Sequence, residues 1–359
     1  MTIVVAMSGG VDSSVAAAIL AEEGHDVIGL SMQLYDQSNG EASFGSCCSL
    51  DDLHDARRVA GALGIAHYVL NFEREFDDQV VSNFVREYVG GRTPIPCAHC
   101  NSDLKFATLA TRAAGFGAEA VATGHYARVE RDPGSGRFLL KRGVDLSKDQ
   151  AYFLFSLTQE QLALARFPVG TVTKETVRTH ARRLGLPVAD KPDSQEICFV
   201  PDGDYATFVA SRAPHMPVGG TIVDREGRTL GTHAGIHRFT VGQRKGLGLS
   251  TSPDGTARYV LALRPAAREV VVGPRDALER TTLTASGVNW ITARSETPLK
   301  VTAQIRHRHQ PAPATVCALP DDRDARAEVR FDAPQVAIAP GQAVVFYDDD
   351  VVVGGGWID

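Results

Sequence analysis

The sequence SGGVDSS at residues 8–14 decides the expected fold of the N-terminal half. It directly follows a β-branched apolar run at residues 2–7 and overlaps the start of a helical pattern at residues 12–23. Two glycines let the backbone turn sharply and approach a ligand closely. The serine hydroxyls, together with the N–H groups of a helix N-terminus, can bind phosphate oxygens. The stretch therefore predicts a phosphate-binding loop between a strand and a helix.

This loop differs from two common nucleotide-binding motifs. No Gly-Lys-Ser/Thr follows it, as in a Walker loop, and the dinucleotide pattern G-x-G-x-x-G is absent. An ordinary strand-to-helix turn with Asp12 or Ser13 as N-cap is the alternative interpretation. A cap needs only one of these side chains and leaves the others without a purpose, so we favour the phosphate-binding interpretation.

The first half alternates strand patterns with helix patterns. Strands are expected at residues 2–7, 27–32, 66–70 and 120–123, and helices at residues 12–23, 51–63 and 101–114. The alternation predicts an α/β doubly wound parallel sheet, with the ligand at the carboxyl ends of its strands. Two polar stretches between these units, residues 36–49 and 90–101, are expected to be long functional loops.

The second half has a different texture. Residues 157–184 are predicted to be helical, with Thr158 and Gln161 spaced as a capping box and Gly185 as a stop. Beyond about residue 205, short Val/Thr/Ile segments alternate with Gly, Pro and Asp clusters and predict two small β modules. We expect domains at residues 1–204, 205–280 and 281–359.

Composition fits a multidomain globular protein. The 359 residues are 43% hydrophobic and 22% charged, and the net charge of −6 argues against nonspecific coating of nucleic acid, so a nucleic-acid partner would need local basic clusters. The N-terminus is a poor signal peptide and no apolar run has the length of a membrane span. We therefore expect a cytoplasmic protein with no membrane partner, whose six cysteines are reduced and serve chemistry, a metal or the core.

Further sequence strings occur in a fixed order after the loop. They are GRTP at residues 91–94 before Cys97 and Cys100, ATGHYA at 122–127, KDQAYF at 148–153, DSQEICF at 193–199, GQRKGLG at 242–248 and PGQ at 340–342. The loop resembles that of the N-type ATP pyrophosphatases. All the strings together resemble the bacterial tRNA-specific 2-thiouridylases, over nearly the whole chain.

The resemblance implies a fold, a reaction and partners. The fold would be a nucleotide-binding α/β domain with a tRNA-facing helical region at about residues 157–190, a central β-rich domain and a C-terminal β-barrel. The reaction would be adenylation of the C2 oxygen of the wobble uridine of tRNA, followed by sulfur transfer from a cysteine persulfide with release of AMP and pyrophosphate. ATP, Mg²⁺, tRNA and a sulfur-donor or sulfur-relay protein would take part.

The resemblance also implies roles for individual residues. Cys100 would be the nucleophile and Cys198 the persulfide carrier. The ATP contacts would be Ala6, Met7, Ser8, Gly9, Gly10, Val11, Asp12, Ser13, Met32 and Gly124. The tRNA contacts would be His125, Lys148, Asp149, Gln150, Arg244, Lys245 and Gln342.

The cysteines leave a chemical choice. Only cysteine can hold sulfane sulfur, and attack by that sulfur leaves a cysteine pair able to form a disulfide. The family commonly has an acidic residue where this chain has Cys97, so Cys97 could resolve Cys100, be a spectator, or join Cys100 and Cys198 as ligands of a [4Fe–4S] cluster. A zinc site with His99 or Cys47 is a further alternative. We favour the disulfide and persulfide route.

The surroundings of the two proposed reactive cysteines differ. Cys100 is expected at a helix start, where the helix dipole would lower its thiol pKa. Cys198 is flanked by apolar residues and could instead be a core residue. Two other functions compete with tRNA thiolation: a ligase that forms an amide or C–N bond on a small metabolite, and a non-enzymatic nucleotide sensor with RNA-binding β domains.

Overall fold

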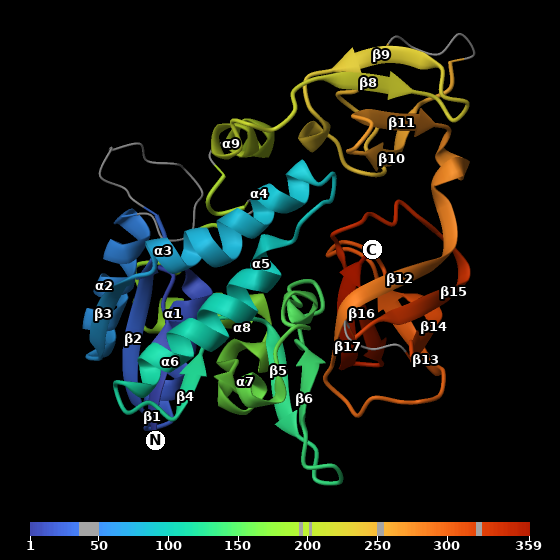
Figure 1. Ribbon diagram of the computed structural model, residues 1–359. Helices are drawn as coiled ribbons and strands as arrows, with labels where there is room; N and C mark the ends of the chain where they lie inside the picture. The colour runs from blue at the N-terminus through green and yellow to red at the C-terminus, as the bar shows by residue number, and fades with distance from the viewer. Residues whose placement is uncertain (36–49, 194–196, 201–202, 250–254, 321–324) are drawn as a thin grey trace. The chain divides into compact units, whose positions relative to one another are not determined.

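The computed structural model describes residues 1–35, 50–193, 197–200, 203–249, 255–320 and 325–359 (Figure 1). The chain divides into two compact units. The first comprises Met1–Val81, Pro96–Gly203 and Asp350–Val353. The second comprises Ser82–Ile95, Asp204–Asp349 and Gly354–Asp359.

A five-stranded parallel sheet forms the centre of the first unit. Its strands, in spatial order, are β3 (Ala66–Asn71), β2 (Asp26–Gln33), β1 (Thr2–Ala6), β4 (Ala120–Ala122) and β7 (Ala165–Arg166). The order runs outward in both directions from β1 and β4, which confirms the predicted doubly wound sheet. The carboxyl ends of β1 and β4 therefore flank the switch point, where open α/β sheets bind ligands.

The helix α1 (Val11–Glu22) is buried on almost all sides. Its Ala16, Ala17 and Ala18 are inaccessible to solvent, because small side chains let the sheet and neighbouring helices approach closely. The remaining helical segments before β4 are α2 (Leu50–Leu63), α3 (Glu73–Phe76), the π-helical η1 (Asp77–Val81), α5 (Pro96–His99), the π-helical η2 (Cys100–Leu109) and α6 (Ala110–Ala114). The helix predicted at 101–114 is confirmed, but the helical run already begins at Pro96, so the loop expected over 90–101 is shorter. The other predicted loop, 36–49, lies outside the described residues.

The single helical region predicted at 157–184 is wrong. The chain there forms α7 (Gln159–Leu164), the sheet strand β7, a 3₁₀ turn at Pro168–Thr171 and α8 (Lys174–Arg183). Pro168 explains the break, because proline disfavours the helical conformation in the residue before it. The predicted capping box of Thr158 and Gln161 is confirmed, and Gly185 ends α8 with a positive φ of 63°.

Further short elements complete the first unit. A hairpin of β5 (Ala127–Arg131) and β6 (Phe138–Arg142) pairs through Lys141 with Val351, and a 3₁₀ turn, η3, covers Ala151–Phe153. Val351 is the first residue of β17 (Val351–Ile358), whose first three residues count with this unit.

The second unit holds two β modules. A four-stranded sheet of β10 (Tyr259–Arg264), β11 (Glu269–Gly273), β8 (Gly220–Val223) and β9 (Thr229–His233) has its own apolar core. Beside it, α4 (Ser82–Val89) packs on α9 (Tyr205–Arg212), where the rings of Tyr88 and Tyr205 stack 4.6 Å apart. Two 3₁₀ turns are η6 (Ile236–Arg238) and η7 (Arg275–Leu278).

The last module is a closed six-stranded barrel. Its strands are β12 (Glu279–Trp290), β15 (Ala327–Val336), β14 (Ala312–Ala318), β13 (Leu299–Gln304), β16 (Ala343–Asp348) and β17, and β12 pairs with β17 to close it. Closure satisfies the backbone groups that edge strands would expose.

Candidate active site

The loop between β1 and α1 is shaped by two glycines with different duties. Gly9 has a φ of 73°, and a Cβ atom there would lie 2.2 Å from the backbone oxygen of Asp52 on α2. Gly10 is the N-cap of α1 and supplies no capping side chain. The alternative of an ordinary turn capped by Asp12 or Ser13 is therefore wrong, and the first-turn N–H groups of α1 are not capped by a side chain.

Two serine hydroxyls form hydrogen bonds within the loop itself. The Ser14 hydroxyl donates to the carbonyl of Gly10 at 2.8 Å, and the Ser13 hydroxyl lies 3.2 Å from the same carbonyl and 3.2 Å from the backbone N of Ser8. Ser13 and Ser14 are buried, whereas Ser8 is exposed. The hydroxyls of Ser13 and Ser14 thus form hydrogen bonds within the loop, and the predicted contact of Ser13 with ATP stays a prediction.

Gly124 supports the loop from the opposite side. It follows β4, and a Cβ atom on it would lie 2.5 Å from the backbone N of Ser13 and 2.6 Å from the carbonyl carbon of Asp12. Only glycine permits this approach at the switch point of the sheet. Met32 on β2 is 6% exposed, and its predicted contact with adenosine stays a prediction. The other predicted ATP residues, Ala6, Met7 and Val11, are continuous with the loop.

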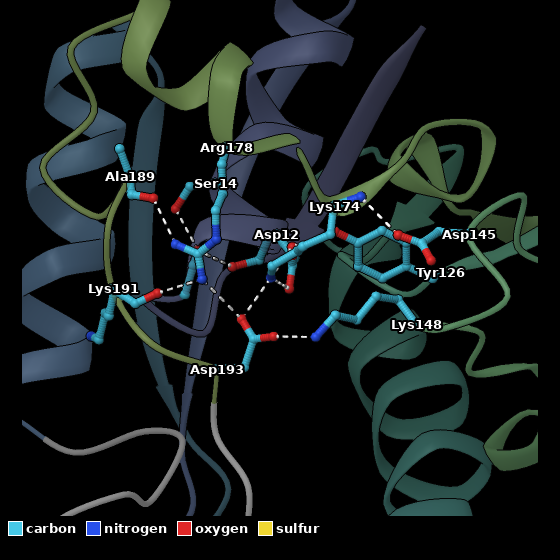
Figure 2. A network of polar contacts seen from close by, with 12 residues as sticks. Asp12, Ser14, Tyr126, Asp145, Lys148, Lys174, Arg178, Ala189, Lys191 and Asp193 are labelled. Atoms are coloured by element: carbon cyan, nitrogen blue, oxygen red, sulfur yellow. Dashed lines mark hydrogen bonds and ion pairs between the residues drawn. The ribbon is translucent and has the colours of Figure 1, made fainter. Parts of the chain in front are cut away.

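An ammonium group lies against the carboxylate of the loop. The Lys174 Nζ atom is 2.8 Å from both carboxylate oxygens of Asp12 and 2.7 Å from Oδ1 of Asp193 (Figure 2). The hydroxyl of Tyr126 donates to Oδ1 of Asp12 at 2.8 Å. Burial and the neighbouring Asp12 carboxylate raise the pKa of Tyr126, so its hydroxyl stays a donor at neutral pH.

The carboxylate of Asp193 contacts three cationic side chains. Its carboxylate accepts from Lys148 at 2.8 Å, from Lys174 at 2.7 Å and from Arg178 at 3.3 Å. Burial alone would raise the pKa of Asp193, but the hydrogen bonds from Lys148 and Lys174 outweigh it and lower the pKa to about 2. Asp193 is therefore a carboxylate throughout the physiological pH range.

A second lysine, Lys191, connects the chain segment that contains Asp193 to the loop. The Lys191 Nζ atom donates to the carbonyl of Gly9 at 3.1 Å and to Asp52 and Asp55 at 2.6 Å each. Burial lowers the pKa of Lys191, and the two carboxylates more than reverse that effect, so the pKa is raised. Figure 2 shows that the carbonyl of Lys191 and the carboxylate of Asp193 both face Arg178, at 3.0 and 3.3 Å.

Apart from Asp12, none of these charged residues was predicted from the sequence to have a role in the ATP site. Tyr126 and Asp193 lie within strings used to identify the family, and Lys148 was assigned to tRNA. For Lys174 and Arg178, the sequence indicated only that they belong to a helix that begins after a threonine. Their partners are distant in sequence, so spacing along the chain could not have paired them.

The described cysteines differ in their exposure to solvent. Cys97 is exposed, Cys100 and Cys198 are half-buried, and no disulfide joins any two of Cys97, Cys100, Cys198 and Cys317. Because the helical run begins at Pro96, Cys97 lies in its first turn and Cys100 one turn later, where a helix dipole acts less strongly than expected. The ring of Phe199, next to Cys198, packs edge-on against Phe76 at 5.4 Å.

Two features bear on the metal alternatives. Within the described ranges, no three His, Cys, Asp or Glu side chains are grouped so that they could hold a metal ion, and Cys97, Cys100 and Cys198 form no such group. Cys47, the possible zinc ligand, lies outside the described residues. His99 instead contacts Asp103 at 3.1 Å, and this hydrogen bond helps to lower the pKa of Asp103 against the opposing effect of burial.

Several predicted tRNA contacts hold internal hydrogen bonds. The Asp149 carboxylate accepts from the backbone N–H groups of Gly143 and Ala151, and the Gln150 side chain accepts from the N–H of Tyr126. His125 pairs with the Thr123 hydroxyl at 2.7 Å, and burial keeps the pKa of this histidine well below its usual value. In the second unit, Gln342 donates to the carbonyl of Thr93, while Arg244 and Lys245 are exposed. Their tRNA roles stay predictions.

Comparison with known families identifies the domains. Residues 1–202 match a family described as the tRNA methyl transferase HUP domain, and residues 206–274 match the tRNA methyl transferase PRC-barrel domain. Residues 280–358 match the aminomethyltransferase beta-barrel domain. The parallel sheet, its glycine-built loop and the two β modules therefore define a HUP-domain protein with two C-terminal β domains.

Two relatives narrow this class. A tRNA-specific 2-thiouridylase of Geotalea uraniireducens is 54% identical over 361 aligned residues, covering 99% of this chain and 94% of that protein. That of Geobacter metallireducens is 53% identical, covering 99% and 96%. The chain belongs to the tRNA-specific 2-thiouridylase family, which confirms the resemblance drawn from the sequence.

Other comparisons add less. The structure of an NMN synthetase from Francisella tularensis aligns with 60% of this chain and with 78% of its own chain, at 17% sequence identity. Its TM-score of 0.34 is too low to carry functional information. Across the described residues, no helix has the length and apolarity needed to cross a membrane.

Proposed function

We propose that this chain is an ATP-dependent tRNA-uridine 2-sulfurtransferase. The loop between β1 and α1 is the observation that carries the proposal: no side chain caps the N-terminus of α1, and Gly9 and Gly124 allow the loop to pack tightly. Its N–H groups and the α1 dipole suit the pyrophosphate of ATP. The names of the relatives supply the substrate class, the uridine of a tRNA.

The first step is adenylation. The C2 oxygen of the uridine attacks the α-phosphorus of ATP, the bond to the bridging oxygen breaks, and pyrophosphate leaves with the charge. The N–H groups of the loop and Lys174, which contacts the loop carboxylate Asp12, would stabilise that charge. Mg²⁺ bound together with ATP would be held by phosphate oxygens, water and one or two carboxylates, and Asp12 is the loop carboxylate that could supply one of them.

The second step moves sulfur. The terminal sulfur of a Cys198 persulfide attacks C2, and the Cys100 thiolate attacks the Cys198 Sγ atom and breaks its bond to that sulfur. AMP leaves with the former C2 oxygen, and a Cys100–Cys198 disulfide remains. A thiol reductant must return two electrons before the next cycle, and a protein persulfide must recharge Cys198. Because the substrate is tRNA, we place the enzyme in the cytoplasm.

The cysteine variants test this route. Cys100→Ser and Cys198→Ser should each stop thiolation, since a hydroxyl can neither hold sulfane sulfur nor form the disulfide, while adenylation continues. Thiolated tRNA is measured by its retardation in a mercury-containing gel, and adenylation by pyrophosphate release. Full thiolation by Cys198→Ser would overturn the persulfide role.

Cys97→Ser separates the disulfide route from the cluster route. It should retain thiolation in the disulfide route, because Cys97 is exposed and takes no part in it. An inactive Cys97→Ser protein without iron, from an iron-containing parent, would establish the cluster route instead. Pyrophosphate release that does not depend on added tRNA would favour the ligase alternative.

A further inference from the structure

One carboxylate on the edge of the candidate ATP site is bound by more positive charge than it can neutralise. Lys148, Lys174 and Arg178 all reach Asp193 within 3.3 Å. These cations lie beside the phosphate-binding loop, where Lys174 also contacts Asp12. Such a cluster is better matched by an anion that carries several charges than by one carboxylate.

Lys174 shows why the carboxylates and a phosphate compete. An ammonium group has three N–H donors, and here they face both oxygens of Asp12 and one of Asp193. The Lys174 side chain is only 12% exposed, so water does not supply spare acceptors around it. A phosphate oxygen can be bound by Lys174 only in exchange for one of these carboxylates.

Asp193 is the carboxylate that is easier to exchange. Asp12 lies in the first turn of the buried helix α1, and Tyr126 holds it with a further hydrogen bond. Asp193 follows an exposed proline, Pro192, and contacts Lys148 and Lys174 through its side chain.

The residues just before Asp193 are fixed independently of its carboxylate. Arg178 donates to the carbonyls of Ala189 and Lys191, at 2.9 and 3.0 Å. The Lys191 side chain is bound by Asp52, Asp55 and the carbonyl of Gly9. A displaced Asp193 would therefore stay tethered near the cations, at a high effective concentration.

We propose that Asp193 is a displaceable internal anion of the pyrophosphate site. It holds Lys148 and Lys174 in place before ATP binds, yields them to the phosphates, and returns to them as pyrophosphate leaves. This inference rests on the proposed function. It makes Asp193 a positioning residue that weakens the binding of substrate and product equally and speeds product release.

Pyrophosphate affinity tests the proposal directly. Titration calorimetry with inorganic pyrophosphate and Mg²⁺ should show that Asp193→Asn binds about three- to tenfold more tightly than the unsubstituted protein, because a partly exposed competing ion pair has been removed. The KM for ATP should fall, and kcat should fall with it where release of pyrophosphate limits turnover. Asp193→Glu keeps the charge and should return the affinity toward the original value.

Asp190→Asn is the matched control. Asp190 lies in the same segment, is exposed and pairs with Arg182 outside the cluster, so its loss should change pyrophosphate affinity less than twofold. Weaker or unchanged pyrophosphate binding in a folded Asp193→Asn protein would overturn the proposal, since Asp193 would then only anchor the cations. Failure of the unsubstituted protein to bind ATP or pyrophosphate would instead overturn the proposed function.

Discussion

Backbone forms one side of the candidate ATP site, and charged side chains form the other. On the first side, Gly9 and Gly124 bring backbone into van der Waals contact with the loop, and no charge is involved. On the second side, Lys174 and Asp193 lie within 2.7 Å of each other and depend on their ionisation. The backbone side has one shape, whereas the charged side can exchange partners with an anionic ligand. Substitutions should therefore affect the two sides differently.

Gly9→Ala should displace the loop on the backbone side of the site and have the largest effect on activity. The new Cβ atom would meet the carbonyl of Asp52 at 2.2 Å, and a φ of 73° adds about 1–2 kcal/mol of strain for any L-residue. The loop must move, and a misplacement of about 1 Å costs on the order of a hundredfold in rate. We expect ATP-dependent pyrophosphate release to fall by at least that factor.

Gly10→Ala is the control for this prediction. Its φ is −92°, and its Cβ would lie 3.5 Å from the Ser8 hydroxyl, which is an ordinary contact. Its unfolding free energy in a urea titration should change by less than about 1 kcal/mol, the range of N-cap substitutions. Equal destabilisation of the two variants would show that the loop is not shaped by contact between Gly9 and α2.

The difference between the two sides also explains what sequence could predict. The loop was predictable because its features lie within seven consecutive residues. Asp12 and Lys174 are 162 residues apart, and Lys148 and Asp193 are 45 apart, so only the fold brings them together. Lysines and aspartates are also common on solvated surfaces, and a charged residue alone does not reveal its partner.

The same limit on prediction from sequence applies to the short elements of the fold. Four sheet strands and α1 were predicted because their apolar patterns are long and regular. The two residues of β7 are too few to show a period, and they lie between two helical patterns. The start of α5 was missed because residues 90–101 form one polar stretch that predicted a loop, although Pro96 is well tolerated in the first turn of a helix.

Lys174→Met should have the next largest effect, on the charged side. It removes the cation that contacts Asp12 and leaves that carboxylate facing the incoming phosphates. Loss of one such electrostatic contact costs about 10²–10³ in kcat. Pyrophosphate release under saturating tRNA should fall by this factor.

Lys148→Met is the matched comparison for Lys174. Its side chain is 37% exposed, against 12% for Lys174, and it contacts Asp193 rather than the loop. Solvent screens it more, so we expect less than a tenfold loss in pyrophosphate release. A larger loss for Lys148→Met than for Lys174→Met would mean that Asp12 is not the centre of the charged side.

The smallest effect that we expect is a fall in the free energy of unfolding at low pH. It arises from Asp193 on the charged side of the site. The pKa of Asp193 is about 2 in the folded protein and about 3.9 in an unfolded chain. Because the folded-state pKa is depressed, the stabilisation is complete above about pH 4 and is lost as the pH falls toward 2. Between pH 6 and pH 3 the linkage amounts to about 1 kcal/mol of unfolding free energy, since the unfolded state binds the proton first. Urea titrations of the unsubstituted protein should show this loss in excess of the loss in Asp193→Asn, where the titrating group is absent. An identical pH dependence in both proteins would mean that Lys148 and Lys174 do not hold Asp193 in solution, and the contrast between the two sides would fail.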